Sequence, residues 1–112
     1  MEINVRQEKQ LAIVAITGSV DALTSREVTS FLSQQIEDGK KDIVVDLSQV
    51  DFMSSAGLRA ILAALKDSRQ LGGDLSLAGA QPGVDKVLKM SGFNKILKTY
   101  PTVTEATRGS GR

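Results

Sequence analysis

Histidine and cysteine are both absent from this chain of 112 residues. Without them the chain cannot build a Ser-His or Cys-His nucleophile pair, a thiolate site, or a zinc site that uses imidazole or sulfur. Carboxylates, lysines, hydroxyls and the backbone are the groups left for chemistry. The composition therefore excludes most hydrolytic and redox enzymes, and we expect a protein that is not an enzyme.

Phosphate-binding glycine motifs are also missing. Neither Gly-x-x-x-x-Gly-Lys-Ser/Thr nor Gly-x-Gly-x-x-Gly occurs, so the usual nucleotide cradles are absent and we expect no cofactor. The formal net charge is +1, from 14 basic and 13 acidic residues. Such a balance gives no electrostatic footprint for nucleic acid or anionic lipid, so we expect proteins or small molecules as partners.

Long apolar runs are lacking as well. The longest is Leu11 to Ile16, far below the roughly 20 residues that a membrane-spanning helix needs. No charged and then apolar leader precedes it. We therefore expect no membrane insertion and a cytoplasmic location.

The apolar residues that are present follow the periods of strands and helices. Strands are predicted at 3–8, 11–17, 42–47, 74–80 and 93–100, and helices at 25–38, from 55 to about 71, and from 82 to about 91. The order is β-β-α-β-α-β-α-β. It predicts an α/β fold, a single-domain mixed β-sheet with helices packed on it, in which the first two strands form an antiparallel hairpin with its turn near Lys9 and Gln10.

The ends of these elements carry further signals. Thr24 and Glu27 have the spacing of a capping box at the start of the first helix. Residues 18–23 are predicted to be a loop and 48–50 a short link. The domain is expected to span 1–102, and 103–112 to be a short flexible tail with at most one helical turn.

Two adjacent serines stand where the strand at 42–47 and its link give way to the second helix. Serine is a preferred N-cap, so the residues alone favour a structural role. With two serines, Ser54 can cap the helix while Ser55 stays free. A phosphate on Ser55 would add about −1.5 to −2 charge at a helix N-terminus that accommodates it, while repelling a surface docked there.

Three aspartates suggest a different hypothesis, namely a metal-binding site. Asp21, Asp46 and Asp51 could form an acidic, Mg²⁺-binding pocket like that of receiver domains. The simpler interpretation, which we prefer, makes Asp21 and Asp51 turn residues and puts Asp46 near a strand end. No metal site is therefore predicted.

The segment Asp46 to Leu58, with the sequence DLSQVDFMSSAGL, closely resembles the signature of the STAS family, specifically its stand-alone bacterial anti-sigma factor antagonists. The likeness extends to 17–21, 71–77 and 87–93. In that family the serine at the position of Ser55 is phosphorylated by an anti-sigma factor that is itself a serine kinase. The resemblance implies that the unphosphorylated protein binds this kinase and frees its sigma factor, and that a PP2C-type phosphatase resets it. ATP would bind the partner.

The resemblance also implies a site. Phosphorylation is expected at Ser55, with Ser54 as second choice. The expected partner-binding residues are Gly18, Ser19, Asp21, Met53, Ser54, Ser55, Ala56, Gly57 and Arg59. The sequence departs from many relatives, which carry Asp at 54, Ser or Thr at 56 and Glu at 19, and the usual closing helix is expected to be short or absent. An alternative is a non-switching STAS module in a lipid-transport or stress-signalling assembly, in which Ser55 is only a cap.

Overall fold

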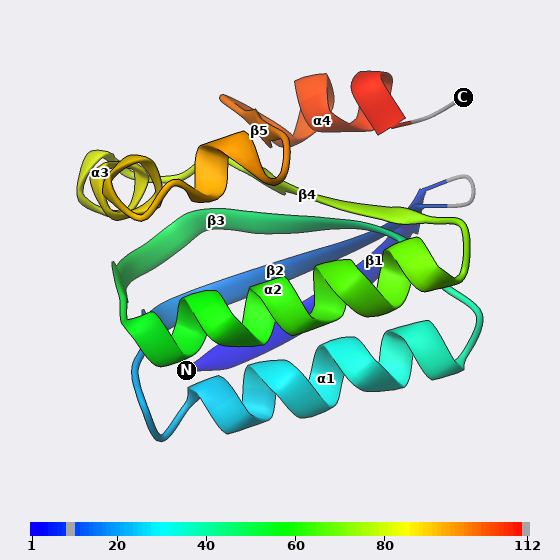
Figure 1. Cartoon of the computed structure of the whole chain (residues 1–112), viewed down its shortest axis with the longest axis horizontal. Coiled ribbons are helices and arrows are strands. Elements are labelled where there is room, and N and C mark those ends of the chain that lie inside the picture. Colours follow the sequence, from blue (N-terminus) through cyan, green and yellow to red (C-terminus); the bar gives the residue numbers. More distant parts are fainter. Residues whose placement is uncertain (9–10, 111–112) are drawn as a thin grey trace.

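A computed structural model describes residues 1–8 and 11–110 (Figure 1). Its elements in chain order are β1 (Glu2–Glu8), β2 (Leu11–Val20), α1 (Ser25–Glu37), β3 (Asp42–Met53), α2 (Ser55–Gln70), β4 (Asp74–Ala78), α3 (Pro82–Met90), a 3₁₀ helix η1 (Phe93–Lys95), β5 (Thr99–Tyr100) and α4 (Val103–Ser110). The predicted turn at Lys9 and Gln10 lies outside the described residues.

The five strands form one mixed sheet in the order β1-β2-β3-β4-β5. Strand β1 is antiparallel to β2, and each following strand is parallel to its neighbour. Parallel neighbours need a crossover, and α1 and α2 supply it for β2 to β3 and for β3 to β4. The predicted fold class is confirmed.

Alternate residues of β3, the central strand, face the two opposite sides of the sheet. Ile43 and Val45 belong to the large apolar cluster with α1 and α2, whereas Val44 belongs to a smaller cluster that includes Ala106 of α4. Figure 1 shows α1 and α2 side by side along one face of the sheet and α4 beyond the other. A β-branched run is buried on both faces because both faces are covered.

Two strands are longer than predicted. Strand β2 continues to Val20 and β3 to Met53, so the predicted loop at 18–23 starts only after Val20, and the predicted link at 48–50 is part of β3. The two strands stay paired through irregularities between Ala15 and Thr17 and between Gly18 and Ser19. Such bulges allow the two strands to stay paired through polar residues. The pattern of apolar residues does not predict this continued pairing.

The start of α1 also differs from the prediction. Thr24 precedes the helix with helical backbone angles and makes no side-chain cap hydrogen bond. Its hydroxyl instead accepts from the Asp21 N–H at 2.9 Å and donates to the Ser19 carbonyl at 2.9 Å. The capping box is wrong because the preceding turn occupies the threonine hydroxyl.

The C-terminal segment forms more regular secondary structure than the flexible tail that was predicted. The predicted last strand at 93–100 is η1 followed by the two-residue β5, and α4 then runs from Val103 to Ser110. Ala106 is fully buried in the smaller cluster with Leu11, Ile13 and Val44. Most of the predicted tail is therefore a short closing helix that is longer than the single turn expected, and buried Ala106 and partly buried Val103 pack it against the smaller cluster.

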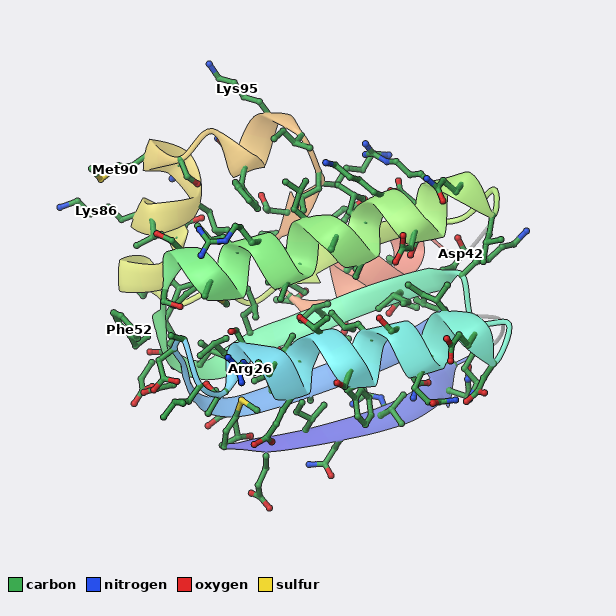
Figure 2. The ribbon with its side chains drawn as sticks, turned by 60° about the horizontal axis from the view of Figure 1, so that its bottom comes forward. Arg26, Asp42, Phe52, Lys86, Met90 and Lys95 are labelled. Atoms are coloured by element: carbon green, nitrogen blue, oxygen red, sulfur yellow. The ribbon has the colours of Figure 1, made fainter. Side chains whose placement is uncertain are left out.

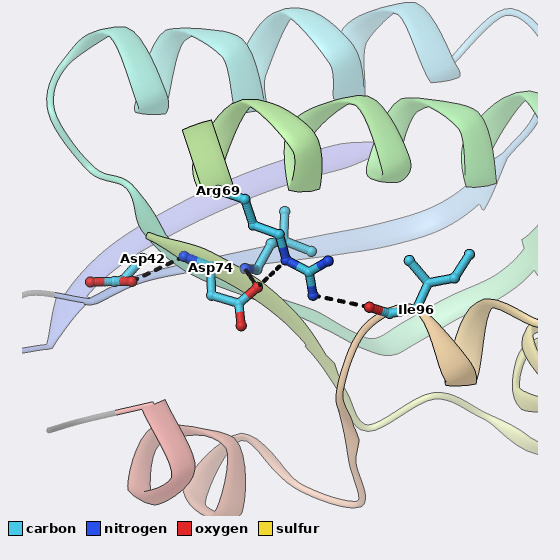
Figure 3. A network of polar contacts seen from close by, with 5 residues as sticks. Asp42, Arg69, Asp74 and Ile96 are labelled. Atoms are coloured by element: carbon cyan, nitrogen blue, oxygen red, sulfur yellow. Dashed lines mark hydrogen bonds and ion pairs between the residues drawn. The ribbon is translucent and has the colours of Figure 1, made fainter. Parts of the chain in front are cut away.

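A polar network joins the last turn of α2 to its surroundings (Figure 3). The Arg69 guanidinium donates to the Asp74 carboxylate at 3.2 Å and to the Ile96 carbonyl at 3.0 Å. Asp42 accepts from the Asp74 N–H at 3.2 Å. These groups are largely exposed, so the network orients the segments more than it stabilises them.

Candidate functional site

The ends of β2 and β3 meet the start of α2 at one edge of the sheet. Ser19 lies opposite Phe52 and Val20 opposite Met53 in the last register pairs of the two strands. The Ser54 N–H then donates to the Val20 carbonyl at 2.8 Å, which turns the chain from β3 into α2. Edges where parallel strands end and helices begin are the usual location of sites in α/β sheets.

The two adjacent serines have different roles in this turn. Ser54 has an extended backbone, and its hydroxyl accepts from the Gly57 N–H at 3.2 Å, as an N-cap does. Ser55 is the first residue of α2 and is exposed. Within 1–8 and 11–110 its hydroxyl has no hydrogen-bond partner. The predicted division between a capping and a free serine is confirmed.

Tight packing beneath the serines fixes the position of α2. Gly57 is buried, and a Cβ atom added there would lie 2.5 Å from the Met53 Sδ and 2.7 Å from the Val20 Cγ1. Glycine therefore lets the first turn of α2 approach the ends of β2 and β3. This close approach determines how far Ser55 stands above the sheet.

Asp21 organises the turn between β2 and α1. Its Oδ1 accepts from the N–H groups of Leu23 at 3.0 Å and Thr24 at 2.9 Å. The Thr24 backbone and hydroxyl hydrogen bonds, together with that of Leu23, lower the pKa of the Asp21 carboxyl below its ordinary value. The prediction that Asp21 is a turn residue is confirmed.

Asp51 does not lie in a turn, as was predicted, but in strand β3. It is an exposed residue of β3, and its carboxylate accepts from the Ser19 hydroxyl at 2.8 Å. The turn assignment is wrong because β3 continues to Met53. This hydrogen bond joins the side chains of neighbouring strands, and Asp51 lies three residues before the N-cap Ser54.

The predicted partner-binding residues differ in exposure. Ser55 and Arg59 are exposed, and they lie one turn apart on α2. Five others are partly exposed, namely Gly18, Ser19, Asp21, Ser54 and Ala56, whereas Met53 and Gly57 are buried. The two buried residues shape the surface from below and do not form it.

Two apolar side chains on this edge were missed. Leu23, in the turn before α1, is 79% exposed, and Phe52, next to the end of β3, is 53% exposed. Figure 2 shows Phe52 projecting outward on the same side of the view as Lys86 and Met90 of α3. The alternation in β3 carried a signal, because a strand that buries Met53 on one face turns Phe52 to the other.

The three aspartates of the metal hypothesis have separate partners. Asp46 accepts from the Ser48 N–H at 3.0 Å, apart from the contacts of Asp21 and Asp51. Among residues 1–8 and 11–110, no three His, Cys, Asp or Glu side chains are grouped to hold a metal ion. In the same part of the chain, no helix combines the length and apolarity that crossing a membrane requires.

Comparisons with known proteins agree with the fold. The family model described as the STAS domain matches residues 2–106. BtrV of Bordetella bronchiseptica, named as an anti-sigma factor antagonist, is 32% identical over 96 residues, 86% of this chain and 83% of its own length. A Thermotoga maritima protein of known structure, also described as an anti-sigma factor antagonist, has a TM-score of 0.93 at 22% identity, covering 98% of this chain and 95% of its own.

Another similar solved structure is that of a phosphorylated protein. It is the Bacillus cell fate determinant SpoIIAA in its phosphorylated form, with a TM-score of 0.74 at 19% identity over 96% of this chain and 97% of its own. At such identities the solved structures show the fold alone. The family model and the BtrV match show more: the chain belongs to the STAS domain family, beside proteins named as anti-sigma factor antagonists.

Proposed function

We propose that the protein is an anti-sigma factor antagonist controlled by phosphorylation of Ser55. In the unphosphorylated state it binds an anti-sigma factor that is a serine kinase, and the sigma factor is released. Phosphorylation of Ser55 ends that binding. The names of the relatives support the role, and the geometry around Ser55 supports the switch.

The division between the two serines carries the proposal. Ser54 already uses its hydroxyl to cap α2, whereas Ser55 presents an exposed hydroxyl that the helix does not need. A kinase can therefore modify Ser55 without breaking the N-cap. The same exposure leaves a phosphoserine open to a PP2C-type phosphatase, which would reset the switch.

The charges around Ser55 favour a change of surface without unfolding. The N–H groups of Ser55 and Ala56 precede the first hydrogen bond of α2, which Leu58 donates to Ser54. They and the helix dipole stabilise a phosphate at this position, and Arg59 lies one turn further on. Asp51 adds a nearby negative charge. A partner that fits the neutral serine would meet a concentrated negative charge after phosphorylation.

Phosphorylation of purified protein tests the proposal. An anti-sigma factor serine kinase is incubated with the chain and ATP, and the product is mapped by mass spectrometry. We expect one phosphate on Ser55 in the unaltered chain and in Ser54→Ala, and none in Ser55→Ala. Phosphate that persists in Ser55→Ala at a residue other than Ser54 would contradict the assignment.

Binding of the same partner tests the switch. Ser55→Asp is expected to abolish binding with nearly unchanged thermal unfolding, whereas Ser55→Ala is expected to bind. Ser54→Ala is a matched control, because it alters the neighbouring hydroxyl without adding charge. A partner that binds Ser55→Asp as tightly as the unaltered chain would instead favour the non-switching STAS module.

A further inference from the structure

The outer edge of β1 has no neighbouring strand in the described part of the chain. The sheet order places β1 first, and its seven residues pair with β2 alone. Apart from Ile3, which is partly buried, every residue of β1 is exposed. Figure 2 shows this strand at the rim of the molecule, with no ribbon beyond it. An edge strand of this length offers a row of backbone groups for pairing with another strand.

The two faces of β1 differ in chemistry. Ile3 and Val5 lie opposite Ile16 and Val14, which belong to the apolar cluster under α1 and α2. Glu2, Asn4, Arg6 and Glu8 therefore point to the other face, where the exposed Arg6 and Glu8 side chains form an ion pair at 3.5 Å. Val5 is 39% exposed although it points to the helical side. The edge thus carries an apolar row on one face and a charged row on the other.

Among the antiparallel registers that pair at least five residues of β1, one makes the charged row self-complementary. If two copies of β1 pair about Asn4, Glu2 of each copy lies opposite Arg6 of the other, and Ile3 lies opposite Val5. Pairing about Val5 would instead place Glu2 opposite Glu8, which juxtaposes like charges. Charged residues usually prevent edge pairing, but here their order favours a single register. We propose that a second copy of this chain pairs with β1 in the register centred on Asn4.

A surface hollow adjoins the apolar row. Ile3, Arg26, Glu27, Ser30 and Phe31 line an open hollow of about 560 Å³ between β1 and α1. In the proposed register Val5 of the second copy stands beside Ile3, on the face that carries this hollow. The pairing would cover both Ile3 and Val5, which β2 and α1 leave partly exposed. An isologous contact of this kind closes as a two-fold dimer and does not propagate.

The two-fold arrangement keeps the Ser55 edges apart. Strand β2 ends at the same end of the sheet at which β1 begins, because the two are antiparallel. Two antiparallel copies of β1 therefore place the two Ser55 edges at opposite ends of a continuous sheet. Dimerisation and phosphorylation are independent, so this proposal does not rest on the proposed function.

A single introduced cysteine tests the register, since the chain has none of its own. Asn4→Cys places two thiols opposite each other on the two-fold axis, where facing Cα atoms in an antiparallel pair are about 4.5–5.5 Å apart, within disulfide range. We expect a linked dimer under mild oxidation. Gln7→Cys is the control on the same strand, because its two copies would lie about 20 Å apart.

Charge reversal tests the pairing in solution. Sedimentation across a concentration series that reaches millimolar should show a species of twice the 12.0 kDa monomer mass. Glu2→Arg and Arg6→Glu should each raise the dimer Kd roughly tenfold, because two opposite-charge pairs become two like-charge pairs. The double variant should restore the dimer, and circular dichroism should show that all three variants fold.

Three results would overturn the proposal: a monomer at every concentration, cross-linking of Gln7→Cys as fast as that of Asn4→Cys, or no recovery in the double variant. Phosphorylation of Ser55 is measured separately on the same proteins. A loss of dimerisation with normal phosphorylation contradicts only the pairing, and the converse contradicts only the switch.

Discussion

The Ser19 hydroxyl donates a hydrogen bond to the Asp51 carboxylate at 2.8 Å, across the neighbouring ends of β2 and β3. The two residues are 32 positions apart in the chain. Both flank the turn that carries Ser54 and Ser55, so this bond helps to hold the candidate site together. Its contribution to stability is limited by exposure.

Removing this bond should have a small effect on folding. Ser19→Ala leaves the Asp51 carboxylate exposed to water, so we expect the free energy of unfolding to fall by about 0.5–1.5 kcal/mol in urea titration. Thr17→Ala, an exposed residue of the same strand, is the control. A loss above about 3 kcal/mol would mean that the bond has a larger structural role than its exposure indicates.

Replacing Ser54 and replacing Ser55 should have different effects on the free energy of unfolding. Ser54→Ala removes the N-cap acceptor for the Gly57 N–H and should cost about 1 kcal/mol in the free energy of unfolding. Ser55→Ala, at the first helical position, should change it by less than about 0.5 kcal/mol. Equal losses in urea titration would contradict the assignment of Ser54 as the cap.

Gly57 should not tolerate a methyl group. Gly57→Ala brings Cβ to 2.5 Å from the Met53 Sδ and 2.7 Å from the Val20 Cγ1, so we expect a loss of about 1–3 kcal/mol despite the better helix propensity of alanine. Gly83→Ala in α3 is the matched control, because no atom lies within 4 Å of its added Cβ. Gly83→Ala should be neutral or slightly stabilising. A Gly57→Ala protein as stable as the control would show that the turn can shift at little cost.

Acid should weaken the turn at Asp21. Hydrogen bonds from Thr24 and Leu23 lower the pKa of this carboxyl in the folded state. Its contribution to stability is therefore complete above the unfolded-state pKa and is lost as the pH falls through the lower folded-state pKa. NMR titration should show the depressed pKa. Asp21→Asn should lose less stability than the unaltered chain over the same acidic range, and equal slopes would contradict this role.

The burial of Ala106 predicts that α4 contributes to the fold. Ala106→Asp places a charge among Leu11, Ile13 and Val44, so we expect a loss of about 2–4 kcal/mol, by unfolding or by detachment of the helix. Thr104→Asp is the control, since Thr104 is exposed in the first turn of α4, where the helix dipole favours a negative charge. Chemical denaturation measures both variants. Equal stability would indicate that α4 is dispensable.

Local patterns were sufficient to predict much of this protein. The 3.6-residue stripes predicted α1, α2 and α3, and the β-branched runs predicted the strands that the large core buries. Ser54 as a cap and Asp21 as a turn residue also followed, because each bonds within three residues of its own position. Signals of this kind are local in the chain, and the tertiary structure did not override them.

The errors of prediction arose where a distant partner decides the structure. Strands β2 and β3 continue through polar residues because each supplies hydrogen bonds to the other. Helix α4 packs through Ala106 and Val103 against strands that include β2 and β3, far away in the sequence. No window of neighbouring residues contains this information.

The sequence by itself determined the chemistry available to the protein: no imidazole, no thiol, and two adjacent serines at the start of a helix. Only the tertiary structure decided which surface those serines share. It joins Ser19 to Asp51, buries Met53 and Gly57, and leaves Ser55 and Arg59 exposed. The physical reason is that exposure and contact depend on how strands and helices pack, whereas a cap or a turn depends on residues that are already neighbours in the chain.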